Sequence, residues 1–371
     1  MDMTVFHGAP DRDADLHYFG GFRAPDPFLA AGIDGKRVAV LSPLELDRGR
    51  RESRFDEIHS LEDVREELGE RGDDLAARIL WLAGRHGADR LFLPEDFPAK
   101  TAFDLRSNDG PAIEFLPRPV CAGRRRKSAV ECEAIRRVNG VISGAFRTVE
   151  EILGESSVRD GRIVRGGEPL TAEAVRTEIG IHCLRRGCIA ESTIVAGGDQ
   201  ACDPHERGTG PLPANELIIV DIFPRDEATG YFGDMTRTYC KGTAPEEARR
   251  IVEAVRRAQE LALERIAAGV DGREVHRAVV DFFEGEGFSS GRGEDGFHGF
   301  FHGTGHGLGL EIHEEPRISR GSCRLEEGMT ATVEPGLYYR GRGACRIEDV
   351  VRIGSDGVEM LSDHPVEWEI P

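Results

Sequence analysis

The chain has 371 residues, of which 39% are apolar and 31% charged, a balance typical of globular proteins rather than of disordered or membrane-spanning chains. This length favours two domains, each large enough to hold its own core. The formal net charge of −19 argues against a nucleic-acid partner, because a strongly negative protein repels the phosphate backbone.

The sequence also bears on the compartment. No apolar run approaches the roughly 20 residues of a membrane-spanning helix, so we expect no membrane partner. The first residues lack a basic segment followed by an apolar stretch, the pattern of a secretory signal. The eight cysteines include no C-x-x-C pair. We therefore expect a cytoplasmic protein with reduced thiols.

Up to about residue 120 the chain alternates strand-like and helix-like segments. Short apolar runs at 37–43, 90–94 and 112–117 are typical of strands, and residues 61–87 carry apolar side chains at helical spacing before a glycine stop. No glycine-rich phosphate loop joins a strand to a helix here, so no nucleotide site is expected. The pattern predicts an α/β domain.

A basic run, 124–127, marks the junction to a second domain, in which helices come first. Ser128 and Glu131 have the spacing of a capping box at the start of a helix that runs to residue 153. Further helices are predicted at 172–187, 246–269 and 272–287. Strand-like segments lie between and after them, which indicates an α+β domain with a curved, mostly antiparallel sheet.

Five potential metal ligands lie in these strand-like segments. Four carboxylates and one imidazole form a hard, oxygen-rich set, which suits two adjacent divalent cations such as Mn²⁺ or Co²⁺ better than one tetrahedral zinc ion. Any one of them alone would more often be a cap, turn or structural residue. The five residues are Asp221, Asp234, His306, Glu334 and Glu348.

The predicted ligands have polar neighbours on the same strand face. Because alternate residues of a strand share a face, threonines accompany the carboxylates where a core strand would carry valine or leucine. This pattern predicts that one face of the sheet is a site and the other carries the core. The groups that share a face are Asp234, Thr236 and Thr238; Thr330, Thr332 and Glu334; and Arg346 and Glu348.

The glycine-rich segment 302–309 contains one of these ligands and admits other interpretations. A zinc-protease helix would need H-E-x-x-H, and four alternating glycines cost a helix about 1 kcal/mol each. A dinucleotide loop would need the G-x-G-x-x-G register. An extended strand that brings the backbone close to the metals fits better, with His313 as a second imidazole.

Taken in order, four motifs resemble those of the pita-bread-fold metallopeptidases (family M24), most closely the Xaa-Pro aminopeptidases and Xaa-Pro dipeptidases (prolidases). They are G-D-M-T-R-T, H-G-T-G-H-G-L-G-L-E-I-H-E, T-V-E-P-G-L-Y and R-I-E-D-V-V. The resemblance implies an α+β protein in which a smaller creatinase-like α/β domain, 1–122, precedes a pita-bread catalytic domain, 123–371. It also implies a homodimer.

The resemblance further implies a function and the residues that perform it. Two divalent metals, Mn²⁺ or else Co²⁺ or Zn²⁺, would hold a bridging hydroxide that hydrolyses Xaa-Pro bonds at the N-terminus of peptides or in dipeptides. The five ligands would bind the metals. The catalytic residues would be His205, His313 and Glu334, and the substrate-binding residues His302, Tyr338 and Arg346.

Several alternatives stay open on the sequence alone. Asp226 is a second choice for the first ligand, since the spacer between Asp221 and Asp234 is slightly long for the family. The protein could be an aminopeptidase of other specificity, a metal-free creatinase-like enzyme or a non-enzymatic binding module. Dipeptidase and aminopeptidase differ in whether a basic group captures a free carboxylate. The candidates for that group are Arg237, Arg340, Arg342 and Arg346.

Overall fold

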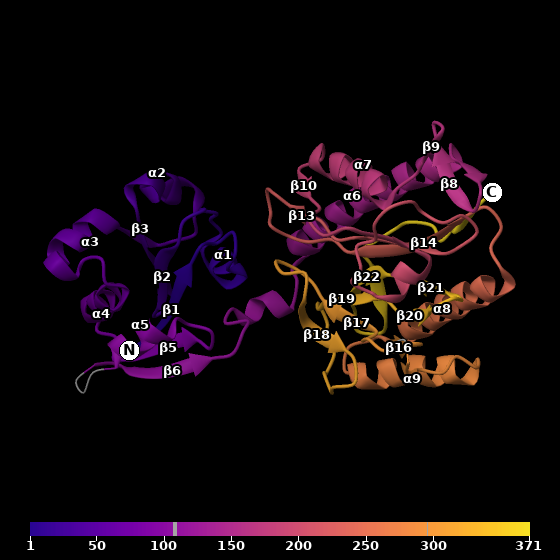
Figure 1. The fold of residues 1–371 in the computed structure, drawn as a ribbon. Coiled ribbons are helices and arrows are strands. Elements are labelled where there is room, and N and C mark those ends of the chain that lie inside the picture. Colours follow the sequence, from indigo (N-terminus) through magenta and orange to yellow (C-terminus); the bar gives the residue numbers. More distant parts are fainter. Residues whose placement is uncertain (107–109, 295) are drawn as a thin grey trace. The chain divides into compact units, whose positions relative to one another are not determined.

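The computed structural model describes residues 1–106, 110–294 and 296–371 and separates into two units, Met1–Arg124 and Arg125–Pro371 (Figure 1). Within these described ranges, none of the helices is both long enough and apolar enough to cross a membrane.

The first unit is built on a six-stranded mixed sheet in the order β4-β3-β2-β1-β5-β6. The central strand β1 pairs antiparallel with β2 and parallel with β5, while β3–β4 and β5–β6 are parallel. Three of these strands were predicted from their apolar runs. The strands are β1 (Asp2–Gly8), β2 (Phe28–Ile33), β3 (Lys36–Leu41), β4 (Glu57–Ser60), β5 (Arg90–Pro94) and β6 (Ala112–Leu116).

Helices bury both faces of this sheet. Met3 and Val5 of β1 belong to one core with residues of α3 and α4, and Phe6 belongs to a second core with Leu16 of α1. This is the α/β arrangement expected from the sequence. The helices are α1 (Ala14–Gly20), α2 (Pro43–Glu52), α3 (Leu61–Leu68), α4 (Leu75–His86) and α5 (Ala99–Leu105), with one 3₁₀ turn, η1 (Gly69–Arg71).

The helical pattern at 61–87 forms two helices rather than one. Gly69 adopts a positive φ of 58°, a conformation that ends α3, and the side chain of Asp74 then caps α4 by accepting a hydrogen bond from Ala76 N. The apolar spacing continued across this break, so periodicity alone did not reveal it.

The second unit begins with the predicted capping box. Ser128 and Glu131 cap each other's backbone N–H groups, and α6 starts at the next residue, Ala129. The four predicted helices are all present. They are α6 (Ala129–Gly154), α7 (Ala172–Leu184), α8 (Glu246–Arg265) and α9 (Gly272–Gly285), with 3₁₀ turns η2 (Ala122–Arg125) and η3 (Gly198–Cys202).

Strands β14, β19 and β22 of this unit lie between two pairs of helices (Figure 1). Helices α6 and α7 share a core with β11, β12 and β14, and α8 and α9 share another with β19, β21 and β22. The sheet is divided into short pieces, mostly antiparallel as predicted, with one parallel pair, β14–β24. The strands are β7 (Ser157–Arg159), β8 (Arg162–Arg165), β9 (Glu168–Pro169), β10 (Cys188–Ile189), β11 (Ile194–Gly197), β12 (Ile218–Ile222), β13 (Arg225–Asp226), β14 (Met235–Lys241), β15 (Gly291–Gly293), β16 (Gly296–His298), β17 (Gly305–Gly307), β18 (Glu314–Ile318), β19 (Thr330–Val333), β20 (Gly336–Tyr339), β21 (Gly343–Arg346), β22 (Asp349–Ile353), β23 (Val358–Met360) and β24 (Glu369–Ile370).

Candidate metal centre

Two of the five predicted ligands lie on neighbouring strands. Asp221 is in β12 and Asp234 directly precedes β14, and the antiparallel register pairs Asp221 with Thr236. Their residues are only 8% and 4% exposed. The surrounding residues of β12 are all apolar and buried, so this strand holds Asp221 rigidly in the interior.

The imidazole ligand comes from the glycine-rich segment, which forms the extended strand predicted for it. His306 lies in β17, opposite Arg317 of β18. A Cβ atom at Gly305 would overlap the carbonyl oxygen of Thr332, and one at Gly307 that of Glu315. These two glycines therefore allow the backbone of β17 to approach its neighbours closely enough to bring His306 to the other ligands.

The last two proposed ligands follow strands, and the backbone N–H of each donates a hydrogen bond to another segment. Glu334 comes directly after β19, and its N–H donates to the carbonyl of Thr304 at 2.8 Å. Glu348 lies between β21 and β22, and its N–H donates to the carbonyl of Thr236 at 3.1 Å. Each carboxylate is thus fixed to a different ligand-bearing segment.

The five side chains converge on one cavity of about 580 Å³. The ligand atoms of Asp234, His306 and Glu348 all lie within 4.8 Å of one another. His306 Nε2 is 3.7 Å from Asp234 Oδ2 and 3.4 Å from Glu334 Oε1. Asp221 lines the same cavity, and its buried Oδ1 has no hydrogen-bond partner within the described part of the chain.

Burial and mutual repulsion perturb the acidic groups strongly. Burial and the neighbouring carboxylates raise the pKa of Asp234 and of Glu348 well above their usual range. Burial raises the pKa of Glu334 to about 7, although the Arg346 guanidinium acts in the opposite direction. Such a concentration of buried negative charge is unfavourable without a compensating cation.

The imidazole is prepared for metal binding by its tautomer. His306 Nδ1 lies 3.1 Å from the carbonyl oxygen of Gly307, which can only accept a hydrogen bond, so Nδ1 carries the proton. The unprotonated Nε2 therefore faces Asp234 and Glu334 with a lone pair that can bind a metal. Burial lowers the pKa of His306 to about 4, so the ring is neutral at pH 7. The orphaned Asp221 oxygen and this donor set fit two divalent cations.

Two of the four threonines predicted to share faces with the ligands donate hydrogen bonds to the proposed ligand carboxylates, whereas Thr330 donates to the carbonyl of Leu308. Thr236 Oγ1 donates to Glu348 Oε2 at 2.7 Å, and Thr332 Oγ1 donates to Glu334 Oε1 at 3.3 Å. Hydrogen bonds of this kind fix the orientation of carboxylates that bind metals. Thr238 Oγ1 instead donates to the carbonyl of Arg346 at 2.9 Å.

A buried hydrogen-bonded chain leads away from the cluster. Arg346 donates through Nη2 to Asp221 Oδ2 at 2.7 Å and through Nη1 to the Tyr338 hydroxyl at 2.9 Å. His302 Nδ1 contacts the carbonyl of Gly303, so the Tyr338 hydroxyl donates to His302 Nε2, 2.9 Å away. Tyr338 is 0% exposed and does not line the cavity, whereas Arg346 and His302 do.

The two predicted catalytic histidines also line the cavity. His313 packs edge-on against His306, with ring centroids 4.4 Å apart, and burial lowers its pKa to about 4. His205 is exposed at the cavity wall. Both can therefore reach a molecule in the cavity, while their catalytic roles stay a prediction.

Asp226, the alternative first ligand, lies elsewhere. Its Oδ2 forms an ion pair with Arg137, and its Oδ1 accepts hydrogen bonds from Ala228 N at 2.9 Å and Thr229 N at 2.7 Å. Both oxygens are therefore engaged, Oδ2 by Arg137 of α6 and Oδ1 by a turn, and Asp226 does not line the metal cavity. The geometry favours Asp221.

One basic residue that lines the cavity, Arg317, was not predicted from the sequence. Arg317 is an exposed cavity-lining residue of β18, four positions after His313 and directly opposite His306. The four arginines predicted as candidates for binding a free carboxylate make other contacts, and of these four only Arg346 lines the cavity. Arg237 pairs with Asp349, Arg340 donates to the Asp199 carbonyl, Arg342 pairs with Glu247 and Arg346 pairs with Asp221.

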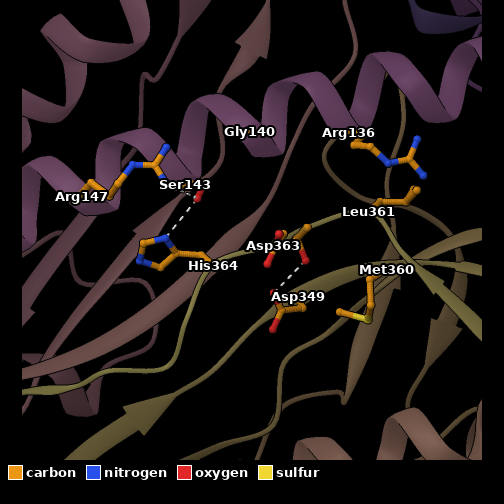
Figure 2. A pocket seen from close by; sticks show the side chains of 10 residues that line it. Arg136, Gly140, Ser143, Arg147, Asp349, Met360, Leu361, Asp363 and His364 are labelled. Atoms are coloured by element: carbon orange, nitrogen blue, oxygen red, sulfur yellow. Dashed lines mark hydrogen bonds between the residues drawn. The ribbon is translucent and has the colours of Figure 1, made fainter.

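A second cavity, of about 680 Å³, lies between α6 and the segment 360–364 (Figure 2). Ser143 Oγ is 3.1 Å from His364 Nδ1, and His364 Nε2 is 2.8 Å from Glu150 Oε1, an order typical of a serine hydrolase. Ser143, however, lies in the interior of α6, where backbone N–H groups serve the helix and offer no oxyanion donors. We interpret the contacts as an anchor for the C-terminal segment.

The raised pKa of Glu334 predicts how the metal-free protein responds to pH. Because the folded pKa of about 7 lies above the ordinary value of 4.5, the folded state binds more protons between these values, and stability falls as pH rises through this window. Glu334→Gln should remove this dependence. Thermal unfolding of dialysed proteins at pH 5 to 8 should show the variant gaining stability over the parent as pH rises. A constant difference would contradict the shift.

The sequence matches a known protein family over more than half of its length. Residues 133–355 match the model of metallopeptidase family M24. A probable dipeptidase PepE of Mycobacterium tuberculosis is 30% identical over 246 residues, 66% of this chain and 60% of that protein. The Xaa-Pro dipeptidase of Lactobacillus helveticus is 32% identical over 235 residues, 62% of this chain and 58% of that protein. The chain thus matches about three-fifths of the length of these relatives.

Solved structures match over the whole chain. The X-Pro aminopeptidase from Thermotoga maritima superposes with a TM-score of 0.81 at 23% identity, covering 100% of this chain and 98% of that one. Dipeptidase PepE from Mycobacterium ulcerans superposes with a TM-score of 0.74 at 27% identity, covering 100% and 93%. These likenesses confirm the predicted pita-bread fold with its preceding N-terminal domain.

Proposed function

The chain belongs to metallopeptidase family M24, and we propose that it is a dinuclear-metal-dependent exopeptidase that hydrolyses Xaa-Pro bonds. The observation that carries this proposal is the largely buried cluster of four carboxylates and one neutral imidazole in a single cavity, in which one carboxylate oxygen of Asp221 has no hydrogen-bond partner among the described residues. The complete ligand set argues against the metal-free creatinase-like alternative and against a binding module.

Two divalent cations in this site would polarise the scissile carbonyl and lower the pKa of the attacking water. The protein's own groups would then orient the substrate. His313 is neutral at pH 7, since its pKa is about 4, and can donate a hydrogen bond to the carbonyl oxygen as negative charge develops there. His205 lines the same cavity and can serve a second polar group of the substrate.

The leaving group of an Xaa-Pro bond makes a specific demand. The proline nitrogen carries no hydrogen in the peptide, so it must be protonated before it can depart. We assign this proton transfer to Glu334, the carboxylate of the cluster that is only half-buried and can therefore meet the substrate. Its Oε1 lies 3.4 Å from His306 Nε2, and the side chain lines the substrate cavity.

Charge supports an exopeptidase over an endopeptidase, and a dipeptidase within that class. A free α-amino group is attracted to the carboxylate cluster. Arg317 is the cavity-lining arginine that faces solvent, and its fork of donors suits the free carboxylate of a dipeptide. Arg346, by contrast, is already paired with Asp221 and Tyr338.

A chain-length series tests both parts of this proposal. Purified protein loaded with Mn²⁺ should cleave Xaa-Pro dipeptides faster than Xaa-Pro-Xaa tripeptides, and Arg317→Gln should lower kcat/KM for the dipeptide by about 10- to 100-fold, the value of a charge-assisted contact of 1.5 to 3 kcal/mol. Release of proline or of the amino-terminal residue is measured for each substrate.

The control is Arg320→Gln, which removes an exposed arginine outside the metal cavity and should leave both rates unchanged. Hydrolysis of tripeptides at the higher rate, unaffected by Arg317→Gln, would support an aminopeptidase instead. Metal-loaded protein that cleaves neither substrate, but does cleave peptides without proline, would indicate a different specificity.

The proposal also includes the native metal, the partners and the cellular compartment. We favour Mn²⁺ as the native metal because the ligands are mainly oxygens, with Co²⁺ and Zn²⁺ as alternatives. Peptides are the expected partners, and a homodimer is expected from the family resemblance alone. All eight cysteines are unpaired thiols, which suits the cytoplasm.

A further inference from the structure

A second cluster of metal-binding side chains lies in the first unit, far along the sequence from the centre described above. Glu57 and His59 are alternate residues of β4, the edge strand of the six-stranded sheet, and therefore share a face. His86 is the last residue of α4, where Gly87 turns the chain with a φ of 67°. Two imidazoles and one carboxylate thus come from two elements.

The distances between these groups suit one ion. His59 Nε2 is 2.8 Å and His86 Nε2 is 3.8 Å from Glu57 Oε1, and all three ligand atoms lie within 4.8 Å of one another. Two ligand atoms bound to one tetrahedral zinc ion are about 3.4 Å apart, since each bond is close to 2.1 Å. Small side-chain rotations would bring the three atoms to that separation.

The two imidazole nitrogens that lie near Glu57 Oε1, His59 Nε2 and His86 Nε2, are buried and make no hydrogen bond of suitable geometry among the described residues. The short distance from His59 to Glu57 therefore does not satisfy the ring nitrogen. Buried polar nitrogens are rarely left without a partner, and two that face one carboxylate favour a shared cation.

The surroundings position the imidazoles and favour a cation. Trp81 packs edge-on against the His59 ring at 5.1 Å and is itself held by a hydrogen bond to Glu67 Oε2. His86 lies at the C-terminal end of α4, where the helix dipole is negative. The nearby Arg85 opposes a cation, but its guanidinium stacks on Trp81, 5.3 Å from the ring centroid.

We propose that Glu57, His59 and His86 form a binding site for one zinc-like divalent cation in the N-terminal unit. Two nitrogens and one oxygen match the borderline character of zinc, and the fourth position is open to water. The ion would join the edge strand β4 to the end of α4, so its role is to stabilise this unit. The proposal is independent of peptide hydrolysis.

The experiment uses the full chain with its main centre disabled by Asp234→Asn and His306→Ala. Co²⁺ is the probe, because four-coordinate Co²⁺ has intense visible absorption, and Zn²⁺ then displaces it. We expect one equivalent of Co²⁺ to bind with a four-coordinate spectrum. His86→Ala in this background should weaken binding by more than about 100-fold, the upper value for residues that only support a ligand.

The matched control is Glu67→Gln, which changes a neighbouring carboxylate that contacts Trp81 but lies outside the cluster, and which should retain the spectrum. His59→Ala provides a second test, and circular dichroism verifies that each variant is folded. Absence of Co²⁺ binding in the disabled background would overturn the proposal. So would binding that survives both histidine substitutions. In the otherwise unchanged chain, His86→Ala should leave peptide hydrolysis unaffected.

Discussion

Asp234→Asn is expected to reduce peptide hydrolysis by more than about 10²-fold, the upper value for substitutions that only support a metal ligand. The substitution preserves shape but removes one of the three groups whose ligand atoms lie within 4.8 Å of one another. It also removes a buried carboxylate whose pKa is raised by burial and by its acidic neighbours. The metal-free variant should therefore be more stable than the parent, while metal addition should stabilise it less.

Asp226→Asn is the control for this substitution. It changes the other aspartate of the same hairpin, whose oxygens bind Arg137 and the backbone of a turn. We expect it to lower the melting temperature and to leave metal content and hydrolysis unchanged. Metal analysis, thermal unfolding and hydrolysis rates are measured for both proteins. Retention of two metals in Asp234→Asn, or their loss in Asp226→Asn, would contradict the proposed ligand set.

The meeting of the five proposed ligands in one cavity could be predicted because the signals for it are local. Each ligand stands beside a glycine, threonine or apolar run that fixes a strand, and alternation places its neighbours on the same face. Thr236 and Thr332, chosen by that rule alone, donate to Glu348 and Glu334. The capping box at Ser128 was equally local.

Features that depend on distant segments could not be predicted in this way. The contact of Arg317 with the cavity follows from its pairing with His306, which requires the register between β17 and β18. The cluster of Glu57, His59 and His86 requires the end of α4 to meet an edge strand, and nothing in the sequence specifies that distance. The same holds for the contact between α6 and His364.

The role of Tyr338 illustrates the same limit at the site itself. The family resemblance implies a substrate contact, but its side chain is fully buried and does not line the cavity. Its hydroxyl accepts from Arg346 and donates to His302, so in this structure it joins two cavity residues. Its effect on a substrate would therefore be transmitted through these neighbours.

Arg346→Met should be the most destabilising single substitution in the site, by about 3 to 5 kcal/mol, the cost of leaving one partner of a buried ion pair unpaired. Burial alone would lower the pKa of Arg346, but Tyr338 and the carboxylates raise it well above its ordinary value, so the side chain stays charged. Its loss leaves Asp221 Oδ2 without its cation, next to an Oδ1 that has no hydrogen-bond partner in the described part of the chain.

Chemical denaturation of the metal-free proteins measures this cost, with two comparisons that separate its causes. Tyr338→Phe removes one hydroxyl of the same chain and should cost only about 1 to 3 kcal/mol, since it leaves His302 Nε2 unsatisfied. Arg340→Met removes an exposed arginine of the same hairpin and should change stability by less than about 0.5 kcal/mol.

Metal binding should offset much of the loss in Arg346→Met, because a cation beside Asp221 replaces the missing positive charge. A metal-free Arg346→Met protein as stable as metal-free Arg340→Met would mean that the pair with Asp221 does not hold the cluster together.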